Sequence, residues 1–266
     1  MNAPQPKELL RLATEVGAEA AAMILQRLGT HRSLTTKSSE LDLVTEVDIA
    51  AEHLITERLL AARPDDGIIG EEGTGVATSS GVDWIIDPID GTTSFVYGLP
   101  GFSVSIAARF DGGGLMAGCV HAPVIGSVYA AALGEGATWQ GRPAHCSEAP
   151  SLKKALVGTG FSPDNERRQR QGQVFAQLIP QVRDIRRMGS AALDLGAVAA
   201  GQLDAYFEVG LCEWDYAAGQ LLVTEAGGQV VAELDPATGR AFVAAAAPGI
   251  SDEFFAMLRD LEADRL

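Results

Sequence analysis

The order of helix-like and strand-like segments predicts an α+β fold that continues into an α/β arrangement. Two long amphipathic segments come first, followed by a run of short strands over residues 68–132. Beyond residue 150, strand-like and helix-like segments alternate to the end of the chain. Because these two orders build different layers, we expect an α+β domain over 1–148 and an α/β domain over 149–266.

Two helices are expected in the first half of the chain. Apolar residues recur at helical spacing from Leu9 to Ile24, which is typical of an amphipathic helix. A second helix is expected from about Thr45 to Ala62. Thr45 and Asp48 have the Thr-x-x-Asp spacing of a capping box, which fixes where that helix begins.

The remaining elements follow from hydrophobic alternation and turn residues. In the first half we expect strands at 68–69, 84–86, 102–106, 116–120 and 127–132, with Asp111–Gly114 as the clearest turn. In the second half we expect strands near 155–158, 185, 205–208, 229–232 and 241–245, and helices near 165–178, 190–200, 215–226 and from 251. The alanine-rich segments fall at helix and strand positions, which indicates a closely packed core.

Composition and charge exclude several classes of protein. Hydrophobic residues make up 47% of the chain and charged residues 21%, so it has ample material for a core. The net charge of −15 repels phosphate backbones, which argues against nucleic-acid binding. If the substrate is itself anionic, clustered carboxylates that hold metal ions would supply the missing positive charge. The alternative is a solubilising acidic surface.

Cysteine usage and hydropathy indicate a cytoplasmic protein without a membrane span. The three cysteines Cys119, Cys146 and Cys212 are widely spaced, which argues against a disulfide framework or a structural zinc site. No apolar run approaches the ~18–20 residues that a bilayer requires, and the amino terminus lacks a signal-peptide pattern.

The segment from Trp84 to Phe95 is the most informative for function. An apolar strand runs into Asp87 and Asp90, which are three residues apart and separated by Pro88. Proline restrains its own φ and pushes the preceding residue toward extended geometry, so the turn can aim both carboxylates to one side. Hard divalent cations bind such oxygens. We also expect a helix from Gly91, whose free amides would suit a phosphate.

A purely structural interpretation of this segment is that Asp90 only caps a helix after a common turn. Other acids shift the balance toward a metal site. Glu71 and Glu72 follow another short apolar strand, and Asp215 precedes a helix far downstream. Acids at three strand ends and helix starts can converge on one cluster.

The chain closely resembles the inositol monophosphatase family, particularly its bacterial members. The resemblance is carried by Asp42–Asp48, Gly70-Glu71-Glu72, Asp87-Pro88-Ile89-Asp90-Gly91-Thr92-Thr93, Gly189-Ser190-Ala191-Ala192 and Trp214-Asp215-Tyr216-Ala217-Ala218-Gly219, in family order. It implies a layered α-β-α-β-α sandwich of the inositol monophosphatase and fructose-1,6-bisphosphatase type. It also implies a homodimer, two or three Mg²⁺ ions and inhibition by lithium. Lys37 matches a lysine on the family's metal-site loop, although an exposed loop lysine is the simpler interpretation.

The resemblance also assigns metal ligands. Glu71, Asp87 and the Ile89 carbonyl would hold the first ion, and Asp87, Asp90 and Asp215 the second. A third, weaker ion would lie near Glu71.

The implied catalytic residues are Glu71, Thr92, Asp48 and Asp90. Glu71 and Thr92 would orient the attacking water, and Asp48 would accept a hydrogen bond from Thr92. The competing role for Asp48 is to complete its capping box, and the two contacts could coexist. A second bound water would protonate the departing alkoxide.

Substrate contacts are implied for the residues that line the same motifs: Glu71, Ile89, Asp90, Gly91, Thr92, Gly189, Ser190, Ala191, Glu208 and Asp215. Ser94 replaces a frequent asparagine of the family. The run Arg167-Arg168-Gln169-Arg170 is interpreted as a solvated helix face. Arg186 and Arg187 are the only obvious candidates for a second phosphate site.

The predicted function is Mg²⁺-dependent hydrolysis of myo-inositol monophosphate, a small phosphorylated polyol. Fructose-1,6-bisphosphatase and histidinol-phosphatase activity stay open, because the motifs do not encode pocket shape. From a different class, the chain could be a regulatory binding protein of the transcription machinery, or its metal site could be purely structural.

Overall fold

The structure is a computed structural model that describes residues 4–29, 34–36, 43–111 and 113–265. Lys37 and Asp42, which contribute to the resemblance described above, lie outside these ranges.

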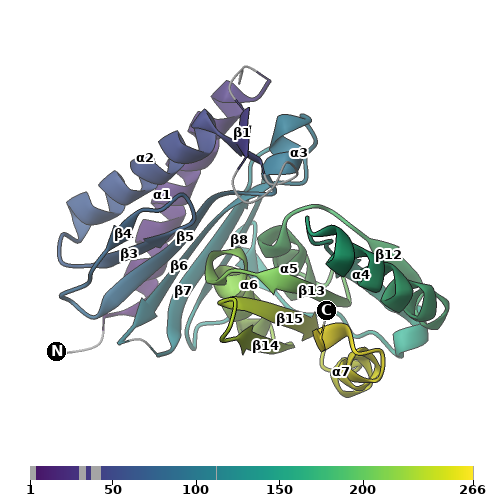
Figure 1. Ribbon diagram of the computed structural model, residues 1–266. Helices are drawn as coiled ribbons and strands as arrows, with labels where there is room; N and C mark the ends of the chain where they lie inside the picture. Colours follow the sequence, from purple (N-terminus) through teal and green to yellow (C-terminus); the bar gives the residue numbers. More distant parts are fainter. Residues whose placement is uncertain (1–3, 30–33, 37–42, 112, 266) are drawn as a thin grey trace.

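Five layers stack in the order helix, sheet, helix, sheet, helix (Figure 1). The first layer holds two helices, the predicted amphipathic pair. The third layer holds two helices between the sheets, and the fifth holds two helices on the far face of the second sheet. In order, these helices are α1 (Pro6–Arg27) and α2 (Glu46–Ala62), α5 (Ala191–Ala199) and α6 (Glu213–Glu225), and α4 (Asn165–Leu178) and α7 (Ser251–Asp260). The layered α-β-α-β-α sandwich is therefore confirmed.

The first sheet has eight strands in the order β10-β9-β8-β7-β6-β5-β3-β4. All neighbours are antiparallel except β3 and β5, which are parallel. Its strands are β3 (Gly67–Gly70), β4 (Gly75–Val76), β5 (Val82–Asp90), β6 (Ser103–Phe110), β7 (Leu115–Ala122), β8 (Ser127–Ala132), β9 (Ala137–Trp139) and β10 (Arg142–Ala144). A separate antiparallel pair is formed by β1 (Leu34–Thr36) and β2 (Leu43–Thr45). The central strand β5 ends at the two aspartates of the predicted site.

The second sheet has five strands in the order β12-β11-β13-β15-β14. β11 runs parallel to both β12 and β13, whereas β15 runs antiparallel to β13 and β14. Its strands are β11 (Leu156–Thr159), β12 (Asp184–Arg186), β13 (Ala205–Leu211), β14 (Gln229–Asp235) and β15 (Arg240–Ala246). Short helices complete the fold: α3 (Thr92–Val96), η1 (Leu152–Lys154), η2 (Ile179–Gln181) and η3 (Ala263–Arg265).

Helices α5 and α6 join the two sheets into one packed body, because their small side chains allow close approach. A Cβ added to Gly219 would lie 2.5 Å from the Cβ of Leu195, and one added to Gly118 would lie 3.0 Å from the Cα of Ala218. The core between the sheets includes residues of both halves of the chain. The alanine-rich segments are thus core, as expected, and the division into domains 1–148 and 149–266 stays a prediction.

Several local features differ from the sequence expectations, among them the unexpected strands β1, β2 and β4. Strands β9 and β10 were not expected; they form a hairpin in which Gln140 and Gly141 both have positive φ, at 54° and 70°. This turn favours glycine or asparagine at its first position, so glutamine gave no signal. Helix α6 begins at Glu213 rather than Asp215. Helix α3 is only five residues long.

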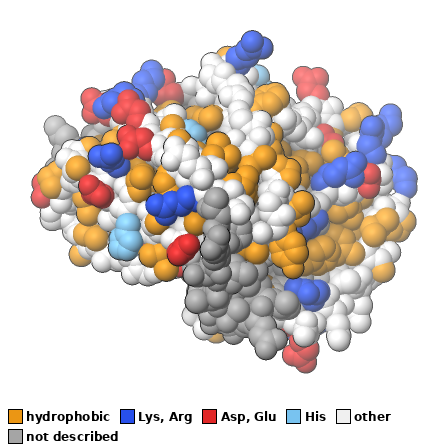
Figure 2. Space-filling view, turned by 90° about the horizontal axis from the view of Figure 1, so that it is seen from above, with side chains coloured by type: hydrophobic (Ala, Val, Ile, Leu, Met, Phe, Trp, Pro, Cys, Tyr) orange, Lys and Arg blue, Asp and Glu red, His pale blue; other side chains and the backbone are white. Residues whose placement is uncertain are grey.

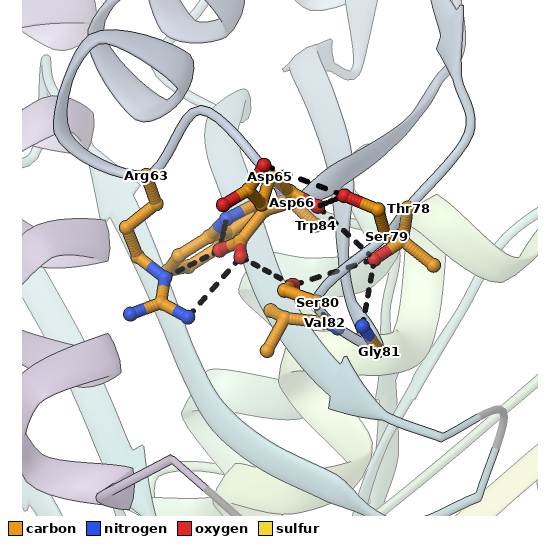
Figure 3. Close-up of polar contacts among 9 residues, drawn as sticks. All are labelled: Arg63, Asp65, Asp66, Thr78, Ser79, Ser80, Gly81, Val82 and Trp84. Carbon is orange, nitrogen blue, oxygen red and sulfur yellow. Dashed lines mark hydrogen bonds and ion pairs between the residues drawn. The ribbon is translucent and has the colours of Figure 1, made fainter. Parts of the chain in front are cut away.

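A buried network around Asp66 fixes the connection from α2 to β3 and the start of β5 (Figure 3). The Asp66 carboxylate accepts hydrogen bonds from the Trp84 indole at 2.9 Å and from the Ser80 hydroxyl at 2.6 Å. It also forms a two-point ion pair with Arg63 through Nε and, at 3.1 Å, Nη2. Ser80 in turn accepts the backbone N–H of Val82 at 3.1 Å. One carboxylate therefore joins a helix end, a loop and the central strand.

Seen from above, basic side chains gather on the side of the molecule that carries α4 and β12 (Figure 2). These two elements and the segments that flank β12 contribute arginines 167, 168, 170, 183, 186 and 187. Six arginines therefore lie on this side of a strongly acidic chain, and further basic side chains are visible on the opposite side (Figure 2). None of the helices in the described ranges is long and apolar enough to cross a membrane.

Candidate active site

The end of β5 places Asp87 and Asp90 at the centre of the site. Both side chains are buried, at 1% and 9% exposure. The strand pairing with β6 shifts register between them, from Asp87 opposite Ser105 to Asp90 opposite Ser103. The Ile89 backbone N–H donates to Asp87 Oδ1 at 3.0 Å. The Asp-Pro-Ile-Asp segment thus ends regular pairing and holds two carboxylates in the interior.

The N-terminus of α5 holds Asp90 from the other half of the chain. The Ser190 hydroxyl and the Ala192 backbone N–H donate to Asp90 Oδ2 at 2.6 and 2.7 Å. Ser190 is also the N-cap of α5, because its oxygen accepts the Leu193 N–H at 3.1 Å. Ser103 on β6 lies 2.9 Å away, hydroxyl to hydroxyl. Two segments 100 residues apart are therefore joined at one carboxylate.

Two glycines allow the loop after β5 to meet the loop before α5. Gly91 has φ +96° and Gly189 has φ +108°. A Cβ on Gly91 would lie 2.6 Å from the Gly189 carbonyl oxygen, so only glycine fits. The expected anion cradle at the following helix is weaker than predicted. Helix α3 has a single turn, and so few aligned peptides give only a small dipole.

Thr92 bridges the end of β5 and the start of α2. Its hydroxyl lies 3.1 Å from Asp48 Oδ1 and 3.2 Å from the Ile89 carbonyl oxygen. The other oxygen of Asp48 accepts the Thr45 backbone N–H at 2.9 Å and the Thr45 hydroxyl. The capping box and the Thr92 contact therefore coexist, one on each carboxylate oxygen.

Glu71 lies on the loop between β3 and β4, and Glu52 of α2 holds that loop in place. The side chains of Glu71 and Asp87 lie within hydrogen-bonding reach. Glu52 is buried, and its two oxygens accept the backbone N–H groups of Glu72 at 2.7 Å and Thr74 at 2.9 Å. Sequence reasoning missed Glu52, because an acidic residue in the middle of a helix gives no signal of its own. Its carboxylate fixes the loop that carries Glu71.

Replacing Glu52 with glutamine tests this support. Both carboxylate oxygens accept N–H groups, so the amide would place a donor against a donor. We expect a loss of about 1–3 kcal/mol in the free energy of unfolding. Urea unfolding measures this effect. Glu57→Gln, an exposed site on the same helix, is the control, and equal stability of the two variants would contradict the role.

Asp215 approaches the same site from the start of α6. Its Oδ2 accepts the Cys212 backbone N–H at 2.7 Å, which closes the first turn of the helix. Ser105 on β6 donates to the Trp214 carbonyl oxygen at 3.2 Å and ties this turn to the first sheet. Glu213 pairs with Arg109 at 2.6 Å, which joins the same helix start to β6.

Glu208 and Asp194 line a small cavity of about 110 Å³ together with Asp90, Ser190 and Asp215. Glu208 Oε2 accepts the Tyr206 hydroxyl at 2.6 Å. Gly160 faces it, and a Cβ there would lie 2.0 Å from a Glu208 oxygen. Gly189, Ala191, Arg187 and Leu211 also line this cavity. Six of the ten predicted substrate contacts therefore line one space, and Glu71 lines a neighbouring one.

The site is an electrostatically strained cluster of acids. Burial raises the pKa of Asp90 to about 7, although hydrogen bonds from Ser190 and Ala192 oppose the shift. Burial and then the charge of Glu71 raise the pKa of Asp87 well above its usual value. Burial and then the charge of Asp90 do the same for the pKa of Asp215. Burial also raises the pKa of Asp48 and of Glu208.

The donor set fits a hard divalent cation, although the side chains are not gathered for one. Within the described residues, no three His, Cys, Asp or Glu side chains stand close enough together to hold a metal ion. Nevertheless, the charges of Glu71 and Asp90 raise the pKa values of both Asp87 and Asp215, in addition to the effect of burial. Oxygen donors of this kind suit Mg²⁺, and a cation would remove the repulsion that raises their pKa values.

A larger cavity of about 810 Å³ extends from this cluster. Glu71, Glu208 and Asp215 line it, together with Trp214. Arg167 and Arg240 line it as well. Arg167 is half-buried, whereas Arg168, Gln169 and Arg170 of the same run are exposed, as expected for a solvated helix face. Arg186 instead pairs with Asp184 beside it at 2.6 Å.

Sequence reasoning also missed Ser103 and Ser105. They alternate with apolar residues, a pattern that is typical of a strand with one face toward solvent.

The model of the Inositol monophosphatase family matches residues 5–256 of this chain. The chain belongs to the inositol monophosphatase family. A Mycobacterium tuberculosis protein named Inositol-1-monophosphatase SuhB is 44% identical over 275 residues, which cover 96% of this chain and 94% of that protein. A solved structure of Mycobacterium tuberculosis SuhB has a TM-score of 0.84 at 41% identity and covers 97% of this chain and 98% of its own.

Two further relatives carry names that bear on function. A Pseudomonas aeruginosa protein named Nus factor SuhB is 42% identical over 229 residues, which cover 84% of each chain. A solved structure described as inositol monophosphate-bound SaIMPase-II has a TM-score of 0.76 at 30% identity and covers 92% of this chain and 91% of its own. The family is thus shown, and the names of its members differ in the role they state.

Proposed function

We propose that the protein is a Mg²⁺-dependent phosphatase that hydrolyses myo-inositol monophosphate to inositol and phosphate. The observation that carries this proposal is that Asp87 and Asp90 at the end of β5 and Asp215 at the start of α6 lie close enough for their charges to act on one another, beside Thr92, which contacts Asp48. The name of the inositol monophosphate-bound relative supports the substrate class.

The residues that would hold Mg²⁺ are Glu71, Asp87, the Ile89 carbonyl, Asp90 and Asp215. When bound, Mg²⁺ lowers the pKa of coordinated water and neutralises phosphoryl oxygens. We include two or three ions in the proposal, as the family resemblance implies.

The chain's own residues would orient and deprotonate the attacking water. When the Thr92 hydroxyl donates to Asp48 Oδ1 over their 3.1 Å contact, the threonine oxygen is left to accept a hydrogen bond from the attacking water. Glu71 would take the other proton as the water oxygen bonds to phosphorus and the bond to the alkoxide oxygen breaks. The alkoxide would then take a proton from solvent water. Asp48 acts through Thr92 and is a positioning residue in this scheme.

Polyol recognition would come from the cavity around Glu208. Its carboxylate can accept hydrogen bonds from hydroxyl groups, and Gly189, Ser190 and Ala191 line the same space. We expect the phosphate to lie beside Asp90 and Thr92, with the ring toward Glu208. A homodimer and inhibition by lithium are part of the proposal through the family resemblance.

Phosphate release from a substrate panel tests the proposal. The panel is inositol 1-phosphate, fructose 1,6-bisphosphate, histidinol phosphate and glycerol 2-phosphate, each with and without Mg²⁺. We expect Mg²⁺-dependent release led by inositol 1-phosphate. A preference for another substrate would rename the enzyme, and the absence of release from all four would overturn the proposal.

The relative named Nus factor SuhB favours a second candidate function, a regulatory contact with the transcription machinery. Catalysis and such a contact can be separated with Asp90→Asn, which removes an acid of the site and leaves the outer surface unchanged. Co-purification of RNA polymerase with both the parent protein and this variant would support the second function. Co-purification with neither would exclude it.

The stability of the magnesium-free protein should fall as pH rises. An acid whose pKa is raised in the folded state stabilises the fold below its unfolded pKa, and this contribution is lost as pH rises through the folded pKa. For Asp90, whose pKa is raised to about 7, the loss between pH 4 and 7 is roughly 4 kcal/mol.

Thermal unfolding with and without Mg²⁺ at pH 5 and 7.5 measures this effect. We expect a larger magnesium-induced rise in Tm at pH 7.5, since protons no longer compete for the carboxylates. The matched variant Asp90→Asn should show a smaller difference between the two pH values. Equal magnesium-induced shifts at both pH values would contradict the assignment of these acids as ligands.

A further inference from the structure

Two arginines from separate elements line the cavity that opens from the acid cluster. Arg167 lies in the first turn of α4, and Arg240 is the first residue of β15. Both line the cavity of about 810 Å³ that also contains Glu71, Glu208 and Asp215. In a chain with a net charge of −15, positive charge beside an acidic site calls for an explanation.

Both guanidinium groups lie against Gly210, at the bulge of β13. Arg240 Nη1 donates to the Gly210 carbonyl oxygen at 2.8 Å. Arg167 approaches the other side, since a Cβ on Gly210 would lie 2.7 Å from Arg167 Nη1. Gly210 has φ +91° and sits where the pairing of β13 with β15 shifts register. Glycine adopts this positive φ without strain, and a side chain at this position would collide with Arg167.

The charges of these arginines are only partly used within the protein. Among the described residues, neither side chain has a carboxylate oxygen within ion-pair distance, and the buried Nε of Arg167 has no hydrogen-bond partner. Asp164, which also lines the cavity, accepts the Arg167 backbone N–H at 2.7 Å and caps α4. Both arginines also line an adjoining cavity of about 230 Å³ with the acids Glu233, Asp235 and Asp264. Hydrogen bonds from Thr238 and Ala237 and, to a smaller extent, the charge of Arg167 lower the pKa of Asp235.

The position of Gly210 relates this pair to the proposed substrate site. Gly210 follows Glu208 by two residues on the same strand, or roughly 7 Å at ~3.3 Å per residue. A substrate whose scissile phosphate lies at the aspartates and whose hydroxyls face Glu208 would direct its far end toward the arginines. Guanidinium groups bind phosphate through two parallel hydrogen bonds.

We propose that Arg167 and Arg240 form a subsite for a second, non-scissile phosphate, so that bisphosphorylated polyols and sugars are preferred over their monophosphorylated counterparts. The inference rests on the proposed phosphatase function and adds a specificity determinant to it. It replaces Arg186 and Arg187 as the expected second-phosphate residues. Arg186 is paired with Asp184, and Arg187 lines the smaller cavity beside Asp90 and Asp194.

Paired substrates that differ by one phosphate test the subsite. The pairs are fructose 1,6-bisphosphate against fructose 1-phosphate and inositol 1,4-bisphosphate against inositol 1-phosphate. For Arg167→Gln and Arg240→Gln we expect about a tenfold rise in KM for each bisphosphate, with kcat unchanged. This pattern marks binding energy shared by ground state and transition state. Monophosphate kinetics should stay within about twofold of the parent protein.

Matched variants separate recognition from structural support. Arg170→Gln removes the same charge from the same helix at a residue that does not line the cavity, and it should leave all four substrates unaffected. Arg240→Lys should recover only part of the bisphosphate preference, because lysine cannot make two parallel bonds. Equal losses for bisphosphate and monophosphate in the Arg→Gln variants would overturn the subsite and assign the arginines to the support of the bulge.

Direct binding distinguishes failure of the subsite from failure of the proposed activity. Calorimetric titration with fructose 1,6-bisphosphate and fructose 1-phosphate, in Mg²⁺-free buffer, requires no turnover. Tighter binding of the bisphosphate, lost in the Arg167→Gln Arg240→Gln double variant, would support the subsite even in a protein that releases no phosphate. Equal binding of the two sugars by the parent protein would overturn it even if inositol 1-phosphate is hydrolysed.

Discussion

Asp90→Asn is expected to lower turnover of inositol 1-phosphate by about 10²–10³-fold, on the scale of losing one electrostatic partner of a transition state. The reason is the removal of one negative charge from the acid cluster. Shape should be kept, because the asparagine oxygen can still accept the Ser190 hydroxyl and the Ala192 N–H that now bond Oδ2 at 2.6 and 2.7 Å. Steady-state phosphate release at saturating Mg²⁺ measures the effect.

Asp83→Asn is the matched control for this variant. Asp83 lies on the same strand and pairs with Arg109 at 3.5 Å, away from the end that carries Asp90. We expect turnover within about twofold of the parent protein. The Asp90 variant should also melt at a higher temperature without Mg²⁺, since a strained buried acid is gone. Turnover of the Asp90 variant near that of the control would remove Asp90 from the proposed chemistry.

The sequence could predict the part of the site that lies within single segments. The strand that runs into Asp87 and Asp90, the capping box of Thr45 and Asp48, and the cap formed by Ser190 all depend on neighbours within a few residues. Local sterics and hydrogen bonding determine such features, so a short motif is enough to identify them. The structure places these residues where their motifs indicate.

Contacts between distant segments could not be predicted in the same way. Ser103 and Ser105 alternate with apolar residues as a half-exposed strand would, yet both are buried because α5 and α6 cover that face. Glu52 acts on a loop about 20 residues away, through two backbone N–H groups. Only the stacking of layers brings these side chains to their partners.

The arginines of the cavity show the same limit for charge. Arg167 belongs to an arginine-rich run whose pattern is typical of a solvated helix face. Its position in the first turn of α4 instead sends it toward Gly210. Arg240 meets it there only because β15 pairs with β13. A sequence pattern gives the charge of a helix, but the packing of the helix decides what that charge faces.

Asp66→Ala is expected to lower the free energy of unfolding by about 3–5 kcal/mol, the range for breaking a buried charged network. The carboxylate is 2% exposed. Its loss would leave the Trp84 indole N–H and the Ser80 hydroxyl without their acceptor and Arg63 without its counter-ion (Figure 3). Each unsatisfied buried group costs about 1–3 kcal/mol.

Urea unfolding of Asp66→Ala, Asp66→Asn and Asp65→Ala separates the network from the surface. Asp65 is the exposed neighbour, and its backbone carbonyl, which accepts the Ser79 and Ser80 N–H groups, survives the change. We therefore expect its loss to stay within about 0.5 kcal/mol. The stability of Asp66→Asn should fall between those of the two alanine variants. Its amide oxygen can still accept a hydrogen bond, but the charge that pairs with Arg63 is lost.

Below their melting temperatures all three variants should turn over substrate at about the parent rate, since the network holds the beginning of β5 and not the end that carries Asp87 and Asp90. Equal stability of the two alanine variants would mean that solvent, rather than Asp66, satisfies Trp84 and Arg63.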